Sequence, residues 1–452
     1  MRRLQLYVLQ DDLLMYFVFN MLDIIQSISS IGFQEILFTI GVVVSAIGLA
    51  VSAIFSFNDI SSIFKHLKFR NASLILLLAI IFVFLMFEFT VIKSTQRVFF
   101  DDVIYQSQAL YLIRTGQAVM CNYGTPFNCF TDYMFHEPIG TAFNIAIGYA
   151  IFGINQAAAY NLQLALATLS ILIVFFISFL LFKDHNAALF SAAFFALSPT
   201  LLVWAKPVTS DLEMMFYAAL SIFFMIIFTY KKNIRTLSAF AFSIVLLTYM
   251  KINALIYLFL LPLLFIIIDG GSIVKSIKDN IHRFIMFFKN NNTMNMLLVL
   301  FLVIGLMPEL LFSYNELTTA PFGYENAQVQ YSCSTGVITP HSKFSAEYFI
   351  ANLCTNLYFW LDKFRSQGIF QPVLFTAFSI SGAVMMAVYK RRIFLMIALW
   401  FLAIFISYTA FYAGAVTYGS DWRFMLGLII QASILAGFCA AGILKFVKYL
   451  MR

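Results

Sequence analysis

Two adjacent carboxylates, Asp101 and Asp102, lie just beyond the end of a long apolar run. Charge beside a membrane-length apolar segment is costly, so it commonly marks a functional site. Apolar and aromatic residues recur at helical spacing through residues 103–116, which predicts an amphipathic helix along the membrane interface. One carboxylate there could cap the helix, but a second adds repulsion that a substrate, a cation or a shared proton would relieve. The pair is therefore our first candidate for general-base chemistry.

Further charged residues lie at the ends of other apolar runs. Lys206 and Asp211 follow one run, and Lys251 lies between two others. Arg423 precedes the last run, within the stretch YGSDWRF. Each cation taken singly could extend its charge to the lipid headgroups. If the loops converge, the cations would form a phosphate-binding site beside the acidic pair.

The elements that must position these residues are membrane helices. The 452 residues are 62% hydrophobic and 11% charged, whereas a soluble domain has roughly twice that charge. We therefore predict an all-α, polytopic transmembrane helical bundle with about eleven spans. The predicted spans are residues 34–56, 72–94, 160–182, 187–205, 212–230, 236–250, 253–268, 294–313, 372–389, 393–413 and 424–447.

The basic residues set the expected orientation of the bundle. The net charge of +7 arises from short clusters between apolar runs, which favours membrane orientation over nucleic-acid binding. If residues 139–154 form a half-membrane or in-plane helix, all the clusters lie on one face, which is then cytoplasmic. The clusters are residues 65–70, 231–235, 275–289, 390–392 and 445–448. This assignment makes the chain an integral multi-pass membrane protein with its candidate site on the extracytoplasmic face.

The same reading divides the chain into four parts. Residues 1–33 would form an N-terminal interfacial segment, because acidic residues interrupt every apolar core in it. Residues 34–313 would form the catalytic transmembrane module, which includes an outer loop at 95–159. Residues 314–371 would be a second outer loop that could close over the site as a lid, although its aromatic residues equally suit an interfacial belt. Residues 372–452 would supply the C-terminal transmembrane helices.

The cysteines offer a second indication of sidedness. Cys121 and Cys129 share the first outer loop, and Cys333 and Cys354 share the second. One disulfide within each loop, in an oxidising compartment, is favoured over four free thiols. A zinc site is disfavoured because no CxxC spacing occurs and His136 and His341 are the only histidines on the predicted outer face.

Four stretches carry a resemblance to a known family. They are DDVIYQSQALYLIRTG, FHEPIGTAFNIAIGYAIFG, ALSPTLLVWAKPVTSDLEMMFYAAL and DWRF. The first resembles the Asp-Glu pair and helix of the C-type (GT-C) membrane glycosyltransferases that use polyprenyl-phosphate sugars. The second resembles their His-Pro-Pro-Leu-Gly stretch, the third their Ser-Pro and later Asp, and the fourth their Arg-aromatic pair. Within that class the chain is similar to the protein mannosyltransferase and aminoarabinose transferase group.

The resemblance implies a function and assigns roles to the candidate residues. The chain would transfer a sugar from a polyprenyl-phosphate (dolichyl-type) donor to a protein, lipid or glycan acceptor, with inversion. Asp101 would be the catalytic base and Asp102 would orient the substrate or the acceptor. The candidates for binding the substrate or the lipid phosphate are His136, Lys206, Asp211, Lys251 and Arg423. Because Asp102 replaces the usual Glu and Glu137 the usual Pro, the acceptor class and a divalent metal cofactor stay open.

The alternative function is that of a transporter or flippase for lipid-linked or amphipathic substrates. Such a protein would place ionisable residues near the bilayer midplane and would show repeated halves. In this sequence the charges lie mainly at the ends of apolar runs, and no Gly-rich nucleotide-binding loop occurs. The pattern favours chemistry at the membrane interface.

Overall fold

The computed structural model describes most of the chain. The described residues are 31–92, 101–116, 139–269, 292–318, 329–330, 337–338, 342–361, 372–412, 414 and 422–451. Among the predicted features that lie outside them are His136, residues 1–30, and the cysteines at positions 121, 129 and 333. Both predicted disulfides therefore stay predictions, whereas Cys439 is a free, buried thiol.

Seven helical segments of the described residues are long and apolar enough to cross a membrane. A helix rises 1.5 Å per residue, so about 20 residues span the roughly 30 Å of a bilayer's hydrocarbon. The seven are α2 (Ile31–His66), α3 (Asn71–Thr90), α6 (Gln156–Phe182), α9 (Ser210–Tyr230), η1 (Ile252–Leu255) with α11 (Ile256–Asp269), α16 (Arg391–Thr409), and η3 (Trp422–Met425) with α17 (Leu426–Leu450). The protein is thus a helical multi-span membrane protein.

Four further apolar helical stretches of the described chain are shorter than a full span. They are α5 (Gly140–Phe152), α10 (Ile234–Thr248), the part Leu298–Leu311 of α13 (Asn292–Thr318), and α15 (Val373–Tyr389). Each of the eleven predicted spans overlaps a helix. How many of them cross the membrane stays a prediction.

The predicted span at residues 187–205 is divided into two helices, α7 (His185–Ala196) and α8 (Pro199–Trp204). Proline lacks a backbone N–H and disfavours the helical conformation in the residue before it. Ser198 accordingly has an extended backbone with φ −64° and ψ 125°, and Pro199 opens the new helix. The break brings Lys206 to the end of a separate short helix.

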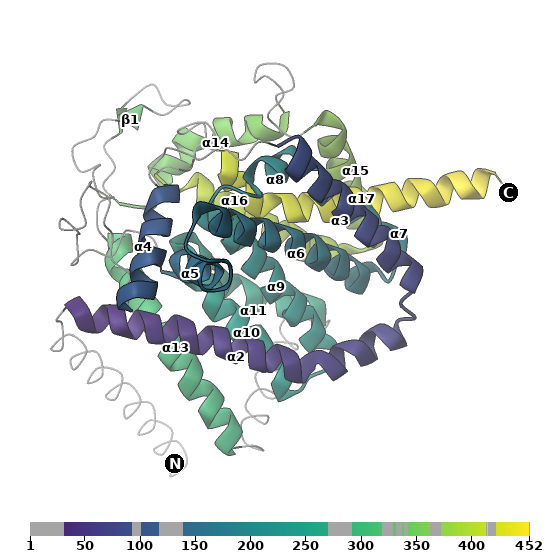
Figure 1. Ribbon diagram of the computed structural model, residues 1–452. Helices are drawn as coiled ribbons and strands as arrows, with labels where there is room; N and C mark the ends of the chain where they lie inside the picture. The colour runs from purple at the N-terminus through teal and green to yellow at the C-terminus, as the bar shows by residue number, and fades with distance from the viewer. Residues whose placement is uncertain are drawn as a thin grey trace, which may run out of the picture.

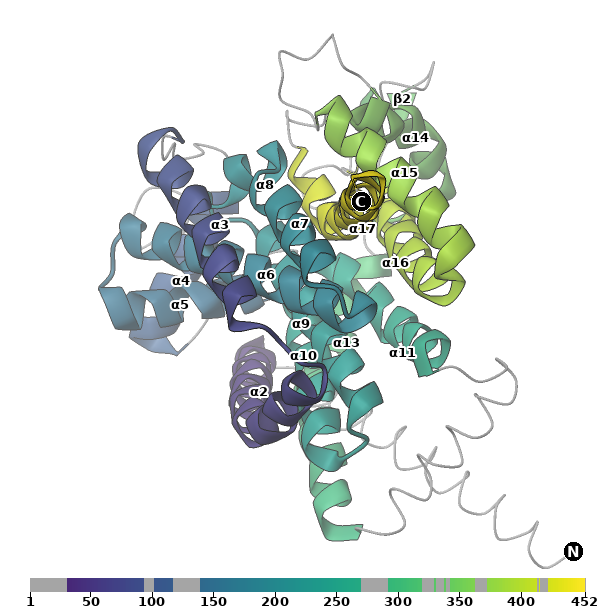
Figure 2. The same cartoon turned by 90° about the vertical axis from the view of Figure 1, so that its right-hand side faces the viewer.

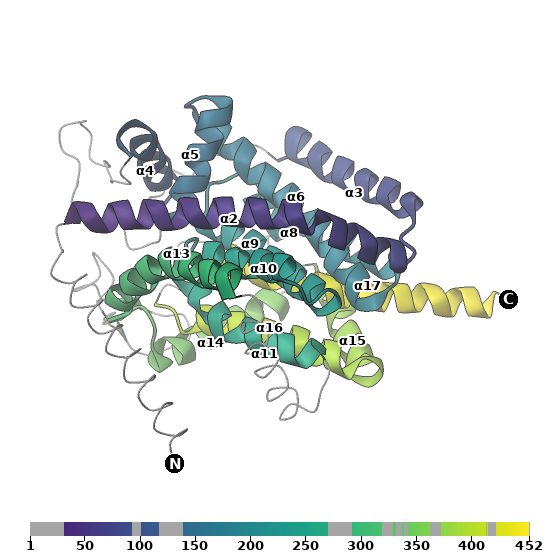
Figure 3. The same cartoon turned by 90° about the horizontal axis from the view of Figure 1, so that it is seen from below.

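The bundle is built around α9 and α17. Helix α17 packs against α7 and α15, while α9 packs against α10 and α6 (Figures 1 and 2). Helix α2 lies against α10 and α13 and exposes apolar side chains such as Ile54 and Phe55. Figure 3 shows α2 and α3 as outer elements, with α17 running out to the C-terminus. Exposed apolar side chains on outer helices are what a lipid environment stabilises.

The two ends of the bundle differ in character. Contacts at one end join the end of α9 to that of α11, through Lys232 and Asp269, and the end of α17 to the start of α7, through Lys445 and Asp184. The basic clusters at residues 231–235 and 445–448 therefore lie at this end. Helices α4 (Asp101–Thr115) and α5 lie at the other end (Figure 1). The membrane face that each end meets stays a prediction.

Helix α5 corresponds to the predicted half-membrane or in-plane helix. Its 13 residues reach about 20 Å, which is too short to cross the hydrocarbon layer unaided. The Gly140 N–H at its start donates to the Tyr249 carbonyl oxygen at 2.8 Å. A Cβ atom on residue 140 would collide with that carbonyl, so only glycine permits this close approach.

The second predicted outer loop contains a small element of sheet, which the all-helical prediction lacked. Strand β1 (Val329–Gln330) pairs antiparallel with β2 (Val337–Ile338). Helix α14 (Ala346–Leu361) follows, and Asn352 donates to the carbonyl oxygens of Thr409 and Phe411 at 3.1 and 3.0 Å. These bonds anchor α14 to the end of α16, the end that also carries Tyr408. A lid role for this loop stays a prediction.

Candidate active site

Asp102 lies on α4 with its side chain buried rather than exposed as a simple cap. Only 1% of the residue is exposed. Gln106, one helical turn later, donates to Asp102 Oδ1 at 2.9 Å, and the Tyr160 hydroxyl donates to Oδ2 at 3.4 Å. A buried carboxylate needs such donors, because an unpaired one would lose its hydration without compensation. Asp102 is thus held in one orientation by residues of α4 and α6.

The two side chains that donate to Asp102, Gln106 and Tyr160, are themselves held by hydrogen bonds. The Tyr149 hydroxyl, on α5, donates to Gln106 Oε1 at 3.2 Å. Gln156 donates to the Tyr160 hydroxyl oxygen at 2.7 Å, so that hydroxyl accepts one bond and donates the other. The network links α4, α5 and α6. Asp101 opens α4, but its side chain lies outside the described residues.

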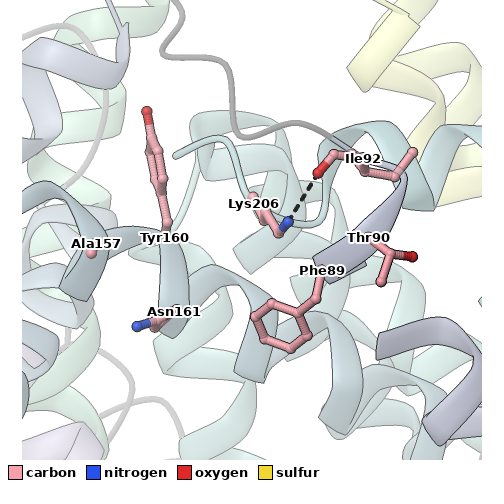
Figure 4. Close-up of a pocket in the computed structure, with 7 residues that line it drawn as sticks. All are labelled: Phe89, Thr90, Ile92, Ala157, Tyr160, Asn161 and Lys206. Carbon is pink, nitrogen blue, oxygen red and sulfur yellow. Dashed lines mark hydrogen bonds between the residues drawn. The ribbon is translucent and has the colours of Figure 1, made fainter. Parts of the chain in front are cut away.

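Tyr160 also lines a pocket of about 370 Å³ beside this network (Figure 4). The pocket lies between the end of α3, the start of α6 and the segment after α8. Its lining residues are Phe89, Thr90, Ile92, Ala157, Tyr160, Asn161 and Lys206. A cation, two hydroxyls and an amide therefore meet apolar walls, a mixture that suits an amphipathic ligand.

Lys206 is held within this wall rather than extended to lipid headgroups. Its Nζ donates to the carbonyl oxygens of Glu88 and Ile92, the latter at 3.2 Å (Figure 4). Its Nζ also lies 3.6 Å from Glu88 Oε2 and 5.5 Å from the centroid of the Phe89 ring. Glu88 is fully buried on α3, and neither carboxylate oxygen accepts a hydrogen bond from a described residue. The Lys206 cation is thus balanced by a carboxylate that the sequence analysis did not select.

Asp211, Lys251 and Arg423 form a second cluster, as convergence of the loops would require. Lys251 Nζ lies 2.9 Å from Asp211 Oδ1, and Arg423 Nε lies 3.4 Å from Oδ2. The Tyr408 hydroxyl donates to Oδ1 at 2.7 Å. Lys251 Nζ also lies 4.8 Å from the centroid of the Phe424 ring, which adds a cation–π contact. One carboxylate, that of Asp211, thus holds both cations in place.

The local structure explains why Asp211 stands at the centre of this cluster. Thr209 caps α9 by accepting a hydrogen bond from the Leu212 N–H at 3.3 Å. Asp211 then lies in the first helical turn, where the helix dipole stabilises a carboxylate. Lys251 precedes η1, and Arg423 lies within η3. All three residues therefore come from the same end of the bundle as α4 and α5.

A third polar group, centred on Glu213, was not predicted. Asn144 and Gln163 donate to the Glu213 carboxylate at 2.6 and 2.7 Å, and the Tyr217 hydroxyl donates to Asn144 Oδ1 at 3.2 Å. Glu213 is fully buried. The group ties α5 to α6 and α9, so it positions the helix that supports Asp102. Its one sequence signal was an acidic residue within an apolar helix.

The predicted site residues thus divide between two places. The structure brings Asp211, Lys251 and Arg423 together, and it places Lys206 with Glu88 beside Tyr160 and Asp102. His136 lies outside the described residues. Within the described part of the chain, no group of three or more His, Cys, Asp or Glu side chains could hold a metal ion.

Comparison with known proteins places this site in context. The family model for dolichyl-phosphate-mannose-protein mannosyltransferases matches residues 136–288. This match contains residues 206, 211, 213 and 251 and ends before the last helices. Among curated proteins, none matches the chain significantly.

Several solved structures share the fold. Apo ArnT from Cupriavidus metallidurans aligns with a TM-score of 0.51 and 14% identity, over 82% of this chain and 59% of ArnT. The same enzyme bound to undecaprenyl phosphate aligns with a TM-score of 0.51 and 14% identity, over 81% of this chain and 59% of ArnT. The oligosaccharyltransferase AglB from Archaeoglobus fulgidus, in complex with an inhibitory peptide and a dolichol-phosphate, aligns with a TM-score of 0.51 and 13% identity, over 86% of this chain and 52% of AglB.

The chain spans between half and three fifths of the length of these proteins. At such low identity the alignments establish the fold alone, and the family match covers about the middle third of the sequence. The two results agree with each other and with the resemblance in the sequence. Residues 136–288 match the dolichyl-phosphate-mannose-protein mannosyltransferase family, and the chain has the fold of the C-type membrane glycosyltransferases ArnT and AglB.

Proposed function

We propose that this protein is a membrane glycosyltransferase that moves a sugar from a polyprenyl-phosphate donor to an acceptor on the extracytoplasmic face. The observation that carries the proposal is the contact between Asp102 and Tyr160, because Tyr160 also lines the pocket of Lys206. An oriented carboxylate and a buried cation thus lie on either side of one tyrosine. These are the two kinds of group that the reaction requires.

The reaction is a direct displacement at the anomeric carbon with inversion. The acceptor hydroxyl oxygen bonds to that carbon while the bond from the carbon to the phosphate oxygen breaks. Asp101 takes the hydroxyl proton, and Asp102, held by Gln106 and Tyr160, orients the reactants. The electron pair of the broken bond leaves with the polyprenyl phosphate. No proton is needed on the leaving group if its growing charge is stabilised.

The leaving phosphate is stabilised by the cations of the two clusters. Lys206 lies at the wall of the pocket, beside the end of α3. Lys251 and Arg423 share the Asp211 carboxylate at the same end of the bundle, and both are cations of the kind that donate to phosphate oxygens. His136 and Asp211 complete the proposed binding residues, with Asp211 acting by holding Lys251 and Arg423.

Two kinds of support favour this proposal over a transporter or flippase. The aligned structures are glycosyltransferases, and two of them were solved with a polyprenyl phosphate, undecaprenyl phosphate in ArnT and dolichol-phosphate in AglB. The charged residues of this chain also meet at one end of the bundle, where an interfacial reaction would occur. The buried carboxylate of Glu213 accepts hydrogen bonds from two amide side chains, which suits a role in holding α5, α6 and α9 together.

Retention of the carrier lipid provides a direct test. We expect polyprenyl phosphate to co-purify with the protein and its amount to fall about tenfold when Lys206 is replaced, since a charge-assisted hydrogen bond is lost. The variant should combine Lys206→Met with Glu88→Gln, so that no unpaired carboxylate is left buried. Quantitative lipid mass spectrometry of the purified protein measures the effect. Lys445→Met, at the other end of the bundle, is the control, and equal loss in both variants would contradict the proposal.

Removal of the Tyr160 hydroxyl tests the orientation of Asp102. We expect Tyr160→Phe to lower the kcat for sugar transfer about threefold to tenfold, because Asp102 loses one of its two described donors. The matched control is Tyr230→Phe, which removes a hydroxyl that donates to the Leu180 carbonyl oxygen at 3.1 Å. Unchanged kcat in Tyr160→Phe would show that this contact does not serve the reaction.

A further inference from the structure

A second cavity lies at the opposite end of the bundle, far along the helices from Asp102. It has a volume of about 360 Å³ and is lined by residues at the ends of α6, α9 and α11 and at the start of α16. In Figure 2, α11 and α16 run side by side next to α9. Its walls are apolar, with Leu181, Ile226 and Ile393 among them, and Lys183 and Arg392 provide cations. It takes no part in the proposed transfer reaction.

Both cations occupy positions that the local backbone does not favour. Lys183 ends α6 in the left-handed conformation, with φ 54° and ψ 34°, where glycine or asparagine would be less strained. Arg392 lies in the first turn of α16, next to the positive end of the helix dipole. The dipole at the end of α6 favours the charge of Lys183 although its backbone is strained, whereas the dipole at the start of α16 disfavours Arg392. A ligand with negative charge would stabilise both cations.

No nearby carboxylate of the described residues forms an ion pair with Lys183 or Arg392. The cavity also contains Asp269, but its carboxylate pairs with Lys232, which lies outside the lining. Two solvent-exposed cations without an ion-pair partner among the described residues thus line a cavity whose remaining walls are mostly apolar.

We propose that this cavity binds the phosphate headgroup of an anionic phospholipid. Lys183 and Arg392 contact the phosphate, and the apolar walls receive the first carbons of the acyl chains. A free phosphate ion would gain only the two charges, whereas a lipid also gains the apolar walls. The basic clusters predict that this end faces the cytoplasm, where anionic lipids attract Lys and Arg at the membrane surface.

Native mass spectrometry of the purified protein in detergent tests the proposal. The probes are phosphatidylglycerol, phosphatidylcholine and inorganic phosphate, each added over a range of concentrations. We expect phosphatidylglycerol adducts to exceed phosphatidylcholine adducts. Because each cation near a membrane surface contributes about fivefold to such binding, Lys183→Gln with Arg392→Gln should reduce the preference about 25-fold.

Two further variants separate a built cavity from general surface charge. Arg391→Gln removes a cation one residue away that does not line the cavity, and we expect less than a twofold change. Thr229→Phe fills the cavity but keeps both cations, and we expect it to lower phosphatidylglycerol binding at least fivefold. An equal loss in Arg391→Gln, or full binding in Thr229→Phe, would overturn the proposal in favour of non-specific attraction.

The experiment with inorganic phosphate distinguishes a phospholipid headgroup from a free phosphate ion as the ligand of the cavity. Displacement of phosphatidylglycerol by millimolar phosphate would show that the site takes a free ion, and would overturn the lipid assignment. Equal binding of phosphatidylglycerol and phosphatidylcholine would also overturn it. None of these outcomes depends on sugar transfer, so failure of the transferase proposal leaves this test intact.

Discussion

Replacing Asp101 by asparagine is expected to abolish sugar transfer from a polyprenyl-phosphate donor. An amide cannot accept the proton of the acceptor hydroxyl, and loss of a general base commonly lowers a rate by roughly 10²–10⁴. The change keeps the size of the side chain and the start of α4, so thermal unfolding should not change. The measurement is a transfer assay on reconstituted protein with a labelled polyprenyl-phosphate sugar, together with an unfolding curve.

A matched control makes this result specific. Asp184→Asn is the same chemical change at the opposite end of the bundle, where Asp184 caps α7 by accepting from the Asn186 N–H at 2.8 Å. Asparagine is as good a cap as aspartate, and the partner Lys445 is largely exposed, so little stability is lost. We expect this variant to retain full activity. Full activity in Asp101→Asn would remove the proposed base and with it the proposed mechanism.

Replacing Asp211 by alanine should have the largest effect on stability. The change leaves Lys251 and Arg423 buried side by side without their shared carboxylate. Breaking a buried ion pair typically costs about 3–5 kcal/mol of unfolding free energy. The intrinsic fluorescence of the four tryptophans can follow thermal unfolding in detergent. Sugar transfer should also fall, because the two cations lose their fixed positions.

The control for Asp211 is an ion pair in a more hydrated place. Asp269→Asn breaks the pair with Lys232, whose side chain is 38% exposed, and should cost less than about 1 kcal/mol. Adding Lys251→Met to the Asp211→Ala variant should restore part of the lost stability, since one unpaired cation is removed. If Asp211→Ala unfolds no earlier than Asp269→Asn, the cluster does not stabilise the fold.

Some features of the fold could be read from the residues alone. A bilayer requires about 20 apolar residues per crossing and leaves no backbone group unpaired, so long apolar runs report helices reliably. The helix after Asp101 was predicted from the helical spacing of its apolar residues and the helix at residues 139–154 from a shorter apolar stretch, and α4 and α5 confirm that both segments are helical. The break at Pro199 was missed because the apolar run continues through it.

The site was predicted in part. Charged residues at the ends of apolar runs led to Asp211, Lys251 and Arg423, and these side chains do meet. Sequence reasoning could not have paired Lys206 with Glu88, since they are 118 positions apart and Glu88 looked like an isolated acid in a span. Tyr160 and Tyr408 were missed because tyrosines are common at membrane interfaces and carry no spacing signal.

The residue pattern was sufficient to establish a helical membrane protein with its chemistry at the ends of the spans. Lipid imposes that pattern strongly, because a charge or an unpaired backbone group is costly within the hydrocarbon layer. The packing of α3, α6, α9, α16 and α17 around one another decides which charged side chains form pairs. Helix packing depends on side-chain contacts between distant segments, and no local pattern encodes them. Asp102 therefore acquired its partners, and Lys206 its pocket, only through the assembled bundle.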